Sequence, residues 1–100
     1  MATTSKQFFR GAASLTETTL YSVPSSTSAV VTNIIITNTS ADPQTVTIEI
    51  DGVPIIVDGE IQGNDAIVWD IKQFLGELAV ISGSASATSI NFHVSGVEIS

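Results

Sequence analysis

The longest uninterrupted apolar pattern in the chain covers residues 28–39, which read Ser-Ala-Val-Val-Thr-Asn-Ile-Ile-Ile-Thr-Asn-Thr. Most of its apolar residues are β-branched and pack well on a pleated surface, so the pattern predicts a strand. Apolar side chains stand at both parities: Val30, Ile34 and Ile36 on one face, Val31 and Ile35 on the other. A strand that is apolar on both faces is expected to be covered on both. Val31 and Ile35 are therefore candidate interface residues, facing a loop or a neighbouring subunit.

Residues 45–51 show the clearest alternation in the chain, with Val46, Ile48 and Ile50 on one side and polar residues on the other. The pair Asp51-Gly52 follows directly and is a strong turn signal between two strands. The pattern predicts a hairpin of residues 45–51 and 53–57. Pro54 cannot donate a ladder hydrogen bond, so the returning strand is expected at a sheet edge.

The second half of the chain predicts three more strands, over residues 67–71, 78–81 and 90–99. Between them, residues 73–77 are expected to form a helical turn or a loop, and the small residues 82–89 a loop. In the last strand the apolar positions change parity after Val94. A bulge at Ser95-Gly96 would return the later apolar residues to the core.

Short strands separated by frequent turn signals, without helical periodicity, indicate an all-β fold. We expect an antiparallel β-sandwich of seven or eight strands, jelly-roll or immunoglobulin-like, over residues 15–100. Another short strand is expected within residues 16–23, before Pro24. The expected core side chains are Val46, Ile48, Ile50, Ile67, Trp69, Ile90, Phe92 and Val94.

Residues 1–14 differ in kind from the rest of the chain. They contain Lys6, Arg10 and the pair Phe8-Phe9 but no acid, whereas the remaining chain has ten acids against Lys72 alone. This contrast predicts an N-terminal arm that docks on a neighbouring subunit and so bridges subunits, with Phe8 and Phe9 as anchors and Lys6 and Arg10 pairing with acidic rims. Removing the arm should then leave the sandwich folded. The alternative is a frayed terminus whose phenylalanines cover an edge of the same subunit.

Composition excludes several classes of function. A net charge of −7 argues against nucleic-acid binding, because too few cations are present to replace phosphate counterions. No apolar run approaches the ~20 residues of a membrane span. The first residues lack the apolar segment of a signal peptide, so we expect the protein to act in the cytoplasm or in a particle assembled there.

Candidate chemistry is sparse, and we expect neither an enzyme nor a cofactor. The sole histidine, His93, has Asn91 and Ser95 beside it on its face but no carboxylate. The acids lie mostly at turns, where solvation is the ordinary interpretation. Residues 58–65 offer oxygen ligands for calcium without the spacing of a recognised loop. Trp69 could stack on a sugar, but it shares a face with Ile67 and is expected in the core.

Two segments carry a resemblance to a known group of proteins. They are residues 20–39, with Tyr-Ser-Val-Pro leading into the long apolar strand, and residues 90–99, ending in Val-Ser-Gly-Val-Glu-Ile. Both resemble small virion proteins of tailed bacteriophages, over about residues 15–99. The resemblance implies a β-sandwich subunit, often trimeric, in a capsid decoration, neck, tail or baseplate. It implies no catalytic residues.

The leading hypothesis is a capsid decoration (cement) protein that stabilises the lattice of the major capsid protein. The alternatives are a neck, tail or baseplate component and, from another class, a carbohydrate-binding module at a fibre tip. The expected partners are further copies of the chain, as a homo-oligomer and in particular a trimer, and the major capsid protein or neighbouring virion proteins. The expected location is the virion.

Overall fold

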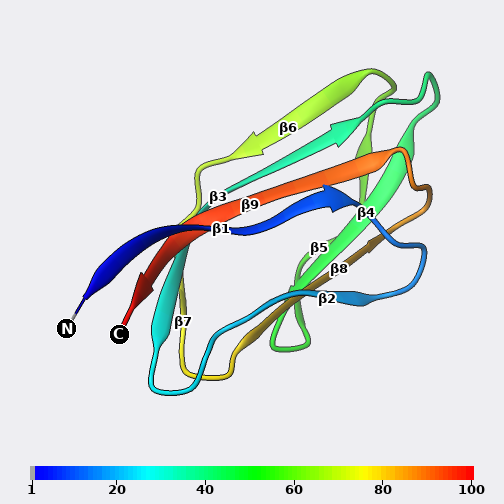
Figure 1. The fold of residues 1–100 in the computed structure, drawn as a ribbon. Coiled ribbons are helices and arrows are strands. Elements are labelled where there is room, and N and C mark those ends of the chain that lie inside the picture. Colours follow the sequence, from blue (N-terminus) through cyan, green and yellow to red (C-terminus); the bar gives the residue numbers. More distant parts are fainter. Residues whose placement is uncertain (1) are drawn as a thin grey trace.

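The structure, a computed structural model, describes residues 2–100, and these form two antiparallel sheets packed face to face (Figure 1). The first sheet contains strands β1, β9, β3 and β6 in that order, with the short β7 also paired to β3. The second has the order β2, β8, β4 and β5. The strand bounds are β1 Thr3–Ala12, β2 Thr18–Ser22, β3 Ser28–Asn38, β4 Gln44–Ile50, β5 Val53–Ile61, β6 Asp65–Trp69, β7 Gln73–Leu75, β8 Val80–Ala85 and β9 Ile90–Ile99.

This strand order is that of a jelly roll. With β6 and β7 counted as one interrupted strand, the eight strands change sheet at every connection except the β4–β5 hairpin, and each sheet combines strands from both halves of the chain. The all-β sandwich predicted from the sequence is thus confirmed, and of the two topologies considered the jelly roll is the one found. The first and last strands, β1 and β9, are neighbours, so both termini lie at the same end of the molecule (Figure 1).

The predicted hairpin is present between β4 and β5. Asp51 has a φ of 53° and Gly52 a φ of 76°, and positive φ at both central residues is the requirement of a type I′ turn. The partner strand β5 is longer than expected and reaches Ile61. It contains two register shifts against β4, and it forms the edge of its sheet, as Pro54 indicated.

The strand count of nine exceeds the expected seven or eight because two segments not expected to be strands, residues 3–12 and 73–75, form β1 and β7, and a further segment, in β8, was misassigned as a loop. Residues 73–75 form strand β7, where a helical turn or a loop was expected, since Phe74 and Leu75 pair with Val30 and Ala29. Strand β8 continues through Gly83 and Ala85 into the expected small-residue loop. Small residues are needed there: a Cβ on Gly83 would lie 3.3 Å from the ring of Phe92.

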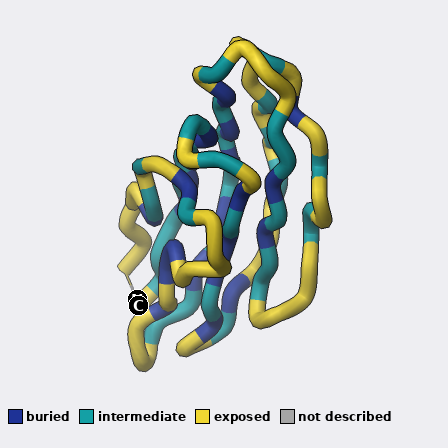
Figure 2. The backbone as a smooth tube through the Cα atoms, turned by 90° about the vertical axis from the view of Figure 1, so that its right-hand side faces the viewer, coloured by how far each residue is buried: buried dark blue, intermediate teal, exposed yellow. Residues whose placement is uncertain are grey.

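The core lies between the sheets, and Figure 2 shows the buried residues concentrated along the strands and the exposed ones at the turns. Five of the eight expected core side chains are fully buried, namely Val46, Ile48, Ile90, Phe92 and Val94. The other three, Ile50, Ile67 and Trp69, are half-buried and pack against this core. The centre of the expected core is therefore confirmed, whereas Ile50 at the end of β4 and Ile67 and Trp69 on β6 lie at its margin.

Bulges occur in the neighbours of β9 and not at Ser95-Gly96, where one was expected. The register between β3 and β9 shifts between Val31 and Asn33, so that Val31 faces inward together with Ile34. Val31 is completely buried in its own subunit, and its prediction as an interface residue is wrong. In β9 the alternation continues unbroken to Val97, which remains on the outer face.

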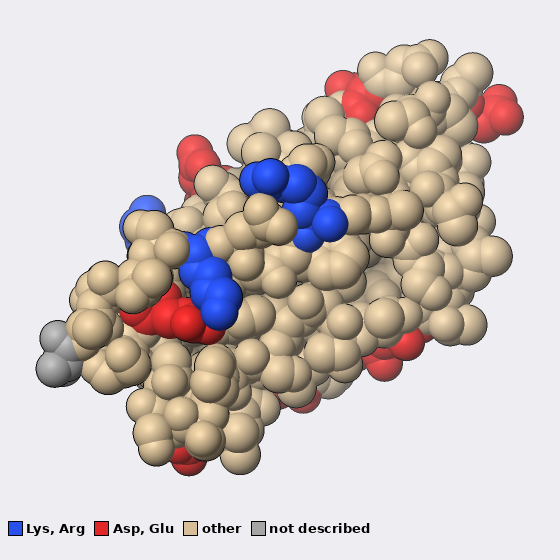
Figure 3. Space-filling model, in the orientation of Figure 1, with Lys and Arg blue, Asp and Glu red and all other residues tan. Residues whose placement is uncertain are grey.

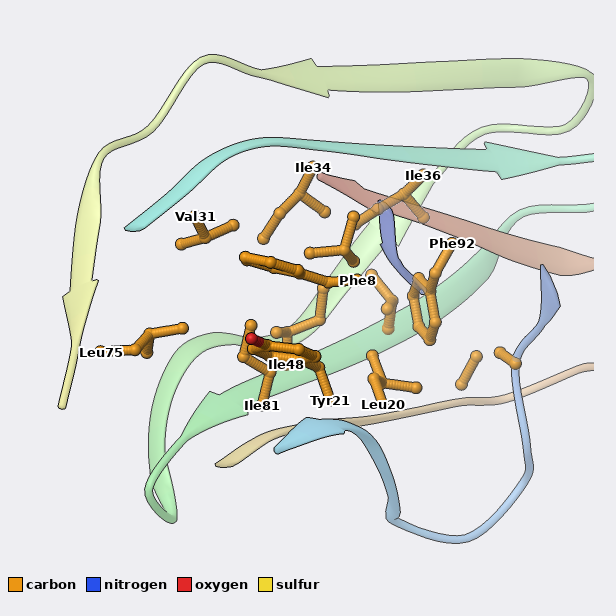
Figure 4. Close-up of a cluster of buried hydrophobic side chains, with 14 of the residues drawn as sticks. Phe8, Leu20, Tyr21, Val31, Ile34, Ile36, Ile48, Leu75, Ile81 and Phe92 are labelled. Atoms are coloured by element: carbon orange, nitrogen blue, oxygen red, sulfur yellow. The ribbon is translucent and has the colours of Figure 1, made fainter. Parts of the chain in front are cut away.

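The predicted N-terminal arm is instead strand β1, paired with β9 along almost its whole length. A register shift between Gln7 and Phe9 inserts Phe8 as an extra residue, so that both phenylalanine rings turn toward the core. Phe8 is 7% exposed, and its ring stacks on that of Tyr21 with 4.0 Å between centroids (Figure 4). Deleting residues 1–14 would therefore remove part of the core, contrary to the expectation from sequence.

Candidate functional site

The outer face of the five-stranded sheet carries an unusual number of apolar side chains. Val30 pairs with both Val97 and Phe74, and Ile35 pairs with Val68. These residues form two groups on the face turned away from the core, with the polar pair Asn33–Ser95 between them. Phe74 is 69% exposed and Val68 64%. We call this set the outer patch, and it consists of Val30, Ile35, Val68, Phe74, Val97 and Ile99.

Four of the six outer-patch residues lie on β3 and β9, which have no outward-facing acid, whereas the exposed Asp70 and Glu77 follow β6 and β7. Strands β1, β3 and β9 contain one carboxylate, Glu98, and it is directed inward to the hydroxyl of Tyr21. Arg10 is exposed on β1 and lies opposite His93, on the same outer face. In Figure 3 basic side chains lie along the course of β1, and acidic ones appear mainly toward the margins of the view. The combination of apolar and basic groups is suited to an acidic partner with an apolar surface.

Lys6, the second predicted basic contact, is engaged within its own subunit. Its Nζ lies 3.4 Å from Glu98 Oε2, and the same carboxylate accepts a hydrogen bond from the Tyr21 hydroxyl. Burial, followed by the hydrogen bond to Glu98, raises the pKa of Tyr21. This cluster and the stacked ring of Phe8 attach β1 to both sheets. Because the Lys6–Glu98 pair is partly exposed, it contributes only about 0–1 kcal/mol, and the aromatic contacts stabilise the attachment more.

The outer face of the four-stranded sheet is polar by contrast. Thr45, Thr47 and Glu49 point outward from β4, opposite serines of β8. Glu17 lies beside Glu49 and accepts a hydrogen bond from Ser82 Oγ at 3.3 Å. The hydrogen bond between the two carboxyl groups, with desolvation and mutual repulsion, raises the pKa of Glu49. The two outer faces therefore differ in both polarity and charge.

Replacing Glu49 by Gln should change the pH dependence of stability. Because folding raises the pKa of Glu49, the folded state binds the proton more tightly, and stability falls as pH increases above about 4. Glu49→Gln removes this titration and should flatten that decline, measured as urea midpoints between acidic and neutral pH. Thr45→Val, on the outer face of the same strand, is the control. It removes no ionisable group and should keep the wild-type slope. An unchanged slope in Glu49→Gln would show that the carboxyl pair does not couple to folding.

Groups considered for chemistry are scattered. His93 is half-buried on the outer sheet face, and Trp69 pairs with Ile34 and turns inward. Within residues 2–100, no three His, Asp or Glu side chains come together as a possible metal site. No helix in this range is long and apolar enough to cross a membrane.

Of the six predicted interface residues, the structure leaves Arg10 and Ile35 on the outer face of the sheet, and Lys6 is also exposed although it pairs with Glu98. Lys6 contacts Glu98, Phe8 and Val31 are buried, and Phe9 packs edge-on against Phe92 with centroids 6.5 Å apart. Sequence reasoning missed Phe74, the most exposed large apolar side chain of the outer patch. There was little signal for it in the amino-acid pattern, since Phe74 and Leu75 are adjacent rather than alternating with polar residues, and three residues are too few to indicate a strand.

Comparison with protein-family models, with curated proteins and with solved structures finds no match to this chain. The class that the fold itself defines is a small jelly-roll sandwich with one apolar outer face.

Proposed function

We propose that this protein is a non-enzymatic structural protein of a bacteriophage virion, and specifically a capsid decoration protein. The observation that carries the proposal is the outer patch, an apolar surface on a rigid sheet that would be costly to leave in water. The jelly-roll fold of the protein is also used by viral capsid subunits, among other proteins. The resemblance of residues 20–39 and 90–99 to virion proteins of tailed phages supports the same proposal.

The mechanism is binding alone. A subunit that binds the assembled lattice, and not the separated capsid proteins, stabilises the lattice by mass action. Copies of the chain associate with one another as a homo-oligomer, proposed as a trimer, and with the major capsid protein. A neck, tail or baseplate position would use the same surfaces in a ring of lower copy number. The carbohydrate-binding alternative is less well supported, because Tyr21 is buried and Trp69 turns inward, so neither offers an open stacking platform.

The test is the abundance of the protein in purified virions, measured on quantitative gels against the major capsid protein. A copy number comparable with that of the capsid protein is expected for a decoration protein. A much lower number would place it in the neck, tail or baseplate. Its absence from the particle would contradict the proposal as a whole.

A further inference from the structure

The edges of both sheets are poorly suited to pairing with another chain. Strand β1 has a bulge at Phe8, and β5 has Pro54 and two register shifts. Strand β2 is five residues long with one register shift, and the remaining edge is interrupted between β6 and β7. Bulges, proline and short strands are the usual protections against edge-to-edge association. Copies are therefore expected to meet through side chains.

Besides the outer patch, a second exposed apolar surface runs along β5. Val53 is 64% exposed and Val57 62%, and Pro54 is exposed beside them. The acids Asp58 and Glu60 are exposed on the same strand. We call these five residues the β5 edge. It combines apolar side chains with negative charge.

The outer patch and the β5 edge are complementary. The patch is apolar. On its β1–β9 side it is flanked by the exposed Arg10 and by His93, without outward acids on β1, β3 or β9, whereas Glu77 lies beside Phe74 and Ile99 at its other end. The β5 edge is apolar and acidic, and no basic residue occurs on β5. Packing two outer patches against each other would instead bring like-charged arginine residues toward one interface. Opposite charge at the rim of an apolar contact favours the patch-to-edge pairing.

We propose that the outer patch of one copy docks on the β5 edge of a second copy of this chain. The inference deepens the proposed function, since it rests on the association of copies and names the surfaces involved. The contact is heterologous: each copy uses the patch on one side and the edge on another. The strand β6, which carries Val68 of the patch, and the strand β5 are the edge strands of the two sheets on the same side of the sandwich, so the two surfaces are adjacent. Because the two surfaces are adjacent, each added copy is rotated relative to the one before it. Such a rotation can close the assembly into a ring such as a trimer.

The test uses one charged substitution on each surface. Phe74→Glu places a charge in the patch, and Val57→Glu places one on the β5 edge. Both side chains are mainly exposed, so melting temperatures measured alongside should show that the fold persists. In sedimentation equilibrium each variant alone should fall to the monomer mass of 10.4 kDa. A 1:1 mixture should form a heterodimer, because the first variant retains its edge and the second its patch.

Ser22→Glu is the charge control, since Ser22 is exposed on β2, at the edge of the four-stranded sheet opposite β5, and belongs to neither surface. It should associate as the wild type does. If Val57→Glu associates normally while Phe74→Glu does not, the patch pairs with something other than the β5 edge. This inference then fails, while association of copies stands. If the Ser22→Glu protein dissociates too, the effect is one of charge alone and the assigned surfaces are wrong. A monomeric wild type would overturn both this inference and the proposed homo-oligomer.

Discussion

Replacing Phe92 by Ala should destabilise the fold by about 3–5 kcal/mol, the usual cost of truncating a buried aromatic side chain. Phe92 is completely buried in the middle of β9, between the two sheets (Figure 4). Its ring contacts the edge of Phe9 and lies over Gly83, where the absence of a side chain provides the space. Because β9 is central in its sheet, the surrounding strands have little freedom to fill the resulting cavity.

Urea unfolding followed by tryptophan fluorescence would measure this loss, since the chain has a single tryptophan. A domain of this size typically has a total stability of about 5–15 kcal/mol, so the variant should unfold at a much lower midpoint. Leu15→Ala truncates an exposed apolar side chain and should change stability by less than about 0.5 kcal/mol. Equal urea midpoints for the wild type and Phe92→Ala would show that Phe92 is not a stabilising part of the core.

Replacing Asn38 by Asp should have an effect of similar size, although only one group changes. Asn38 is 2% exposed at the end of β3. Its Nδ2 donates to the carbonyl oxygens of Asp42 at 2.9 Å, Ile61 at 3.1 Å and Gln62 at 3.3 Å. Its Oδ1 accepts from the backbone N–H of Ser40 at 3.0 Å and from the Ser40 hydroxyl at 2.8 Å. One side chain thus joins the connection after β3 to the end of β5.

A carboxylate at this position would direct a negative charge at three carbonyl oxygens. An unsatisfied buried neutral group costs about 1–3 kcal/mol and a charged one more, so a loss of at least about 3 kcal/mol is expected. Burial would raise the pKa of the introduced carboxyl, so the deficit should shrink at acidic pH and grow as pH rises. Asn33→Asp, on the outer face of the same strand, should be nearly neutral. If both variants unfold at the same urea midpoint, the loop network does not contribute as described.

The strands could be predicted where apolar and polar residues alternate strictly, or where the sequence contains residues typical of a particular turn. The β4–β5 hairpin is an example, because Val46, Ile48 and Ile50 define one face and Asp51-Gly52 defines the turn. The continuation of strand β8 beyond Ile81 could not be predicted, since Ser82-Gly83-Ser84 has low strand propensity. Its small residues make sense only once Phe92 is known to pack above Gly83.

The candidate site was predicted less well, because bulges reverse the side chain parity on which sequence reasoning depends. The shift at Thr32 moves Val31 into the core while Ile35 stays outside. The residues that resembled a free basic arm pair with β9 as an edge strand, and the register shift at Phe8 turns its ring toward the core. Gly96 permits this arrangement, since a Cβ there would lie 2.6 Å from the Phe8 ring and 2.2 Å from the carbonyl oxygen of Val30. None of these pairings is local in sequence.

Sedimentation equilibrium of the wild-type protein tests most directly whether it acts by association of copies through exposed apolar surfaces. A mass that is a multiple of 10.4 kDa is predicted at micromolar concentration, with the trimer as the expected species. Raising the salt concentration should weaken the association only moderately, because apolar contacts supply most of the binding energy and the charged rim is screened. A monomer at every accessible concentration would contradict the account.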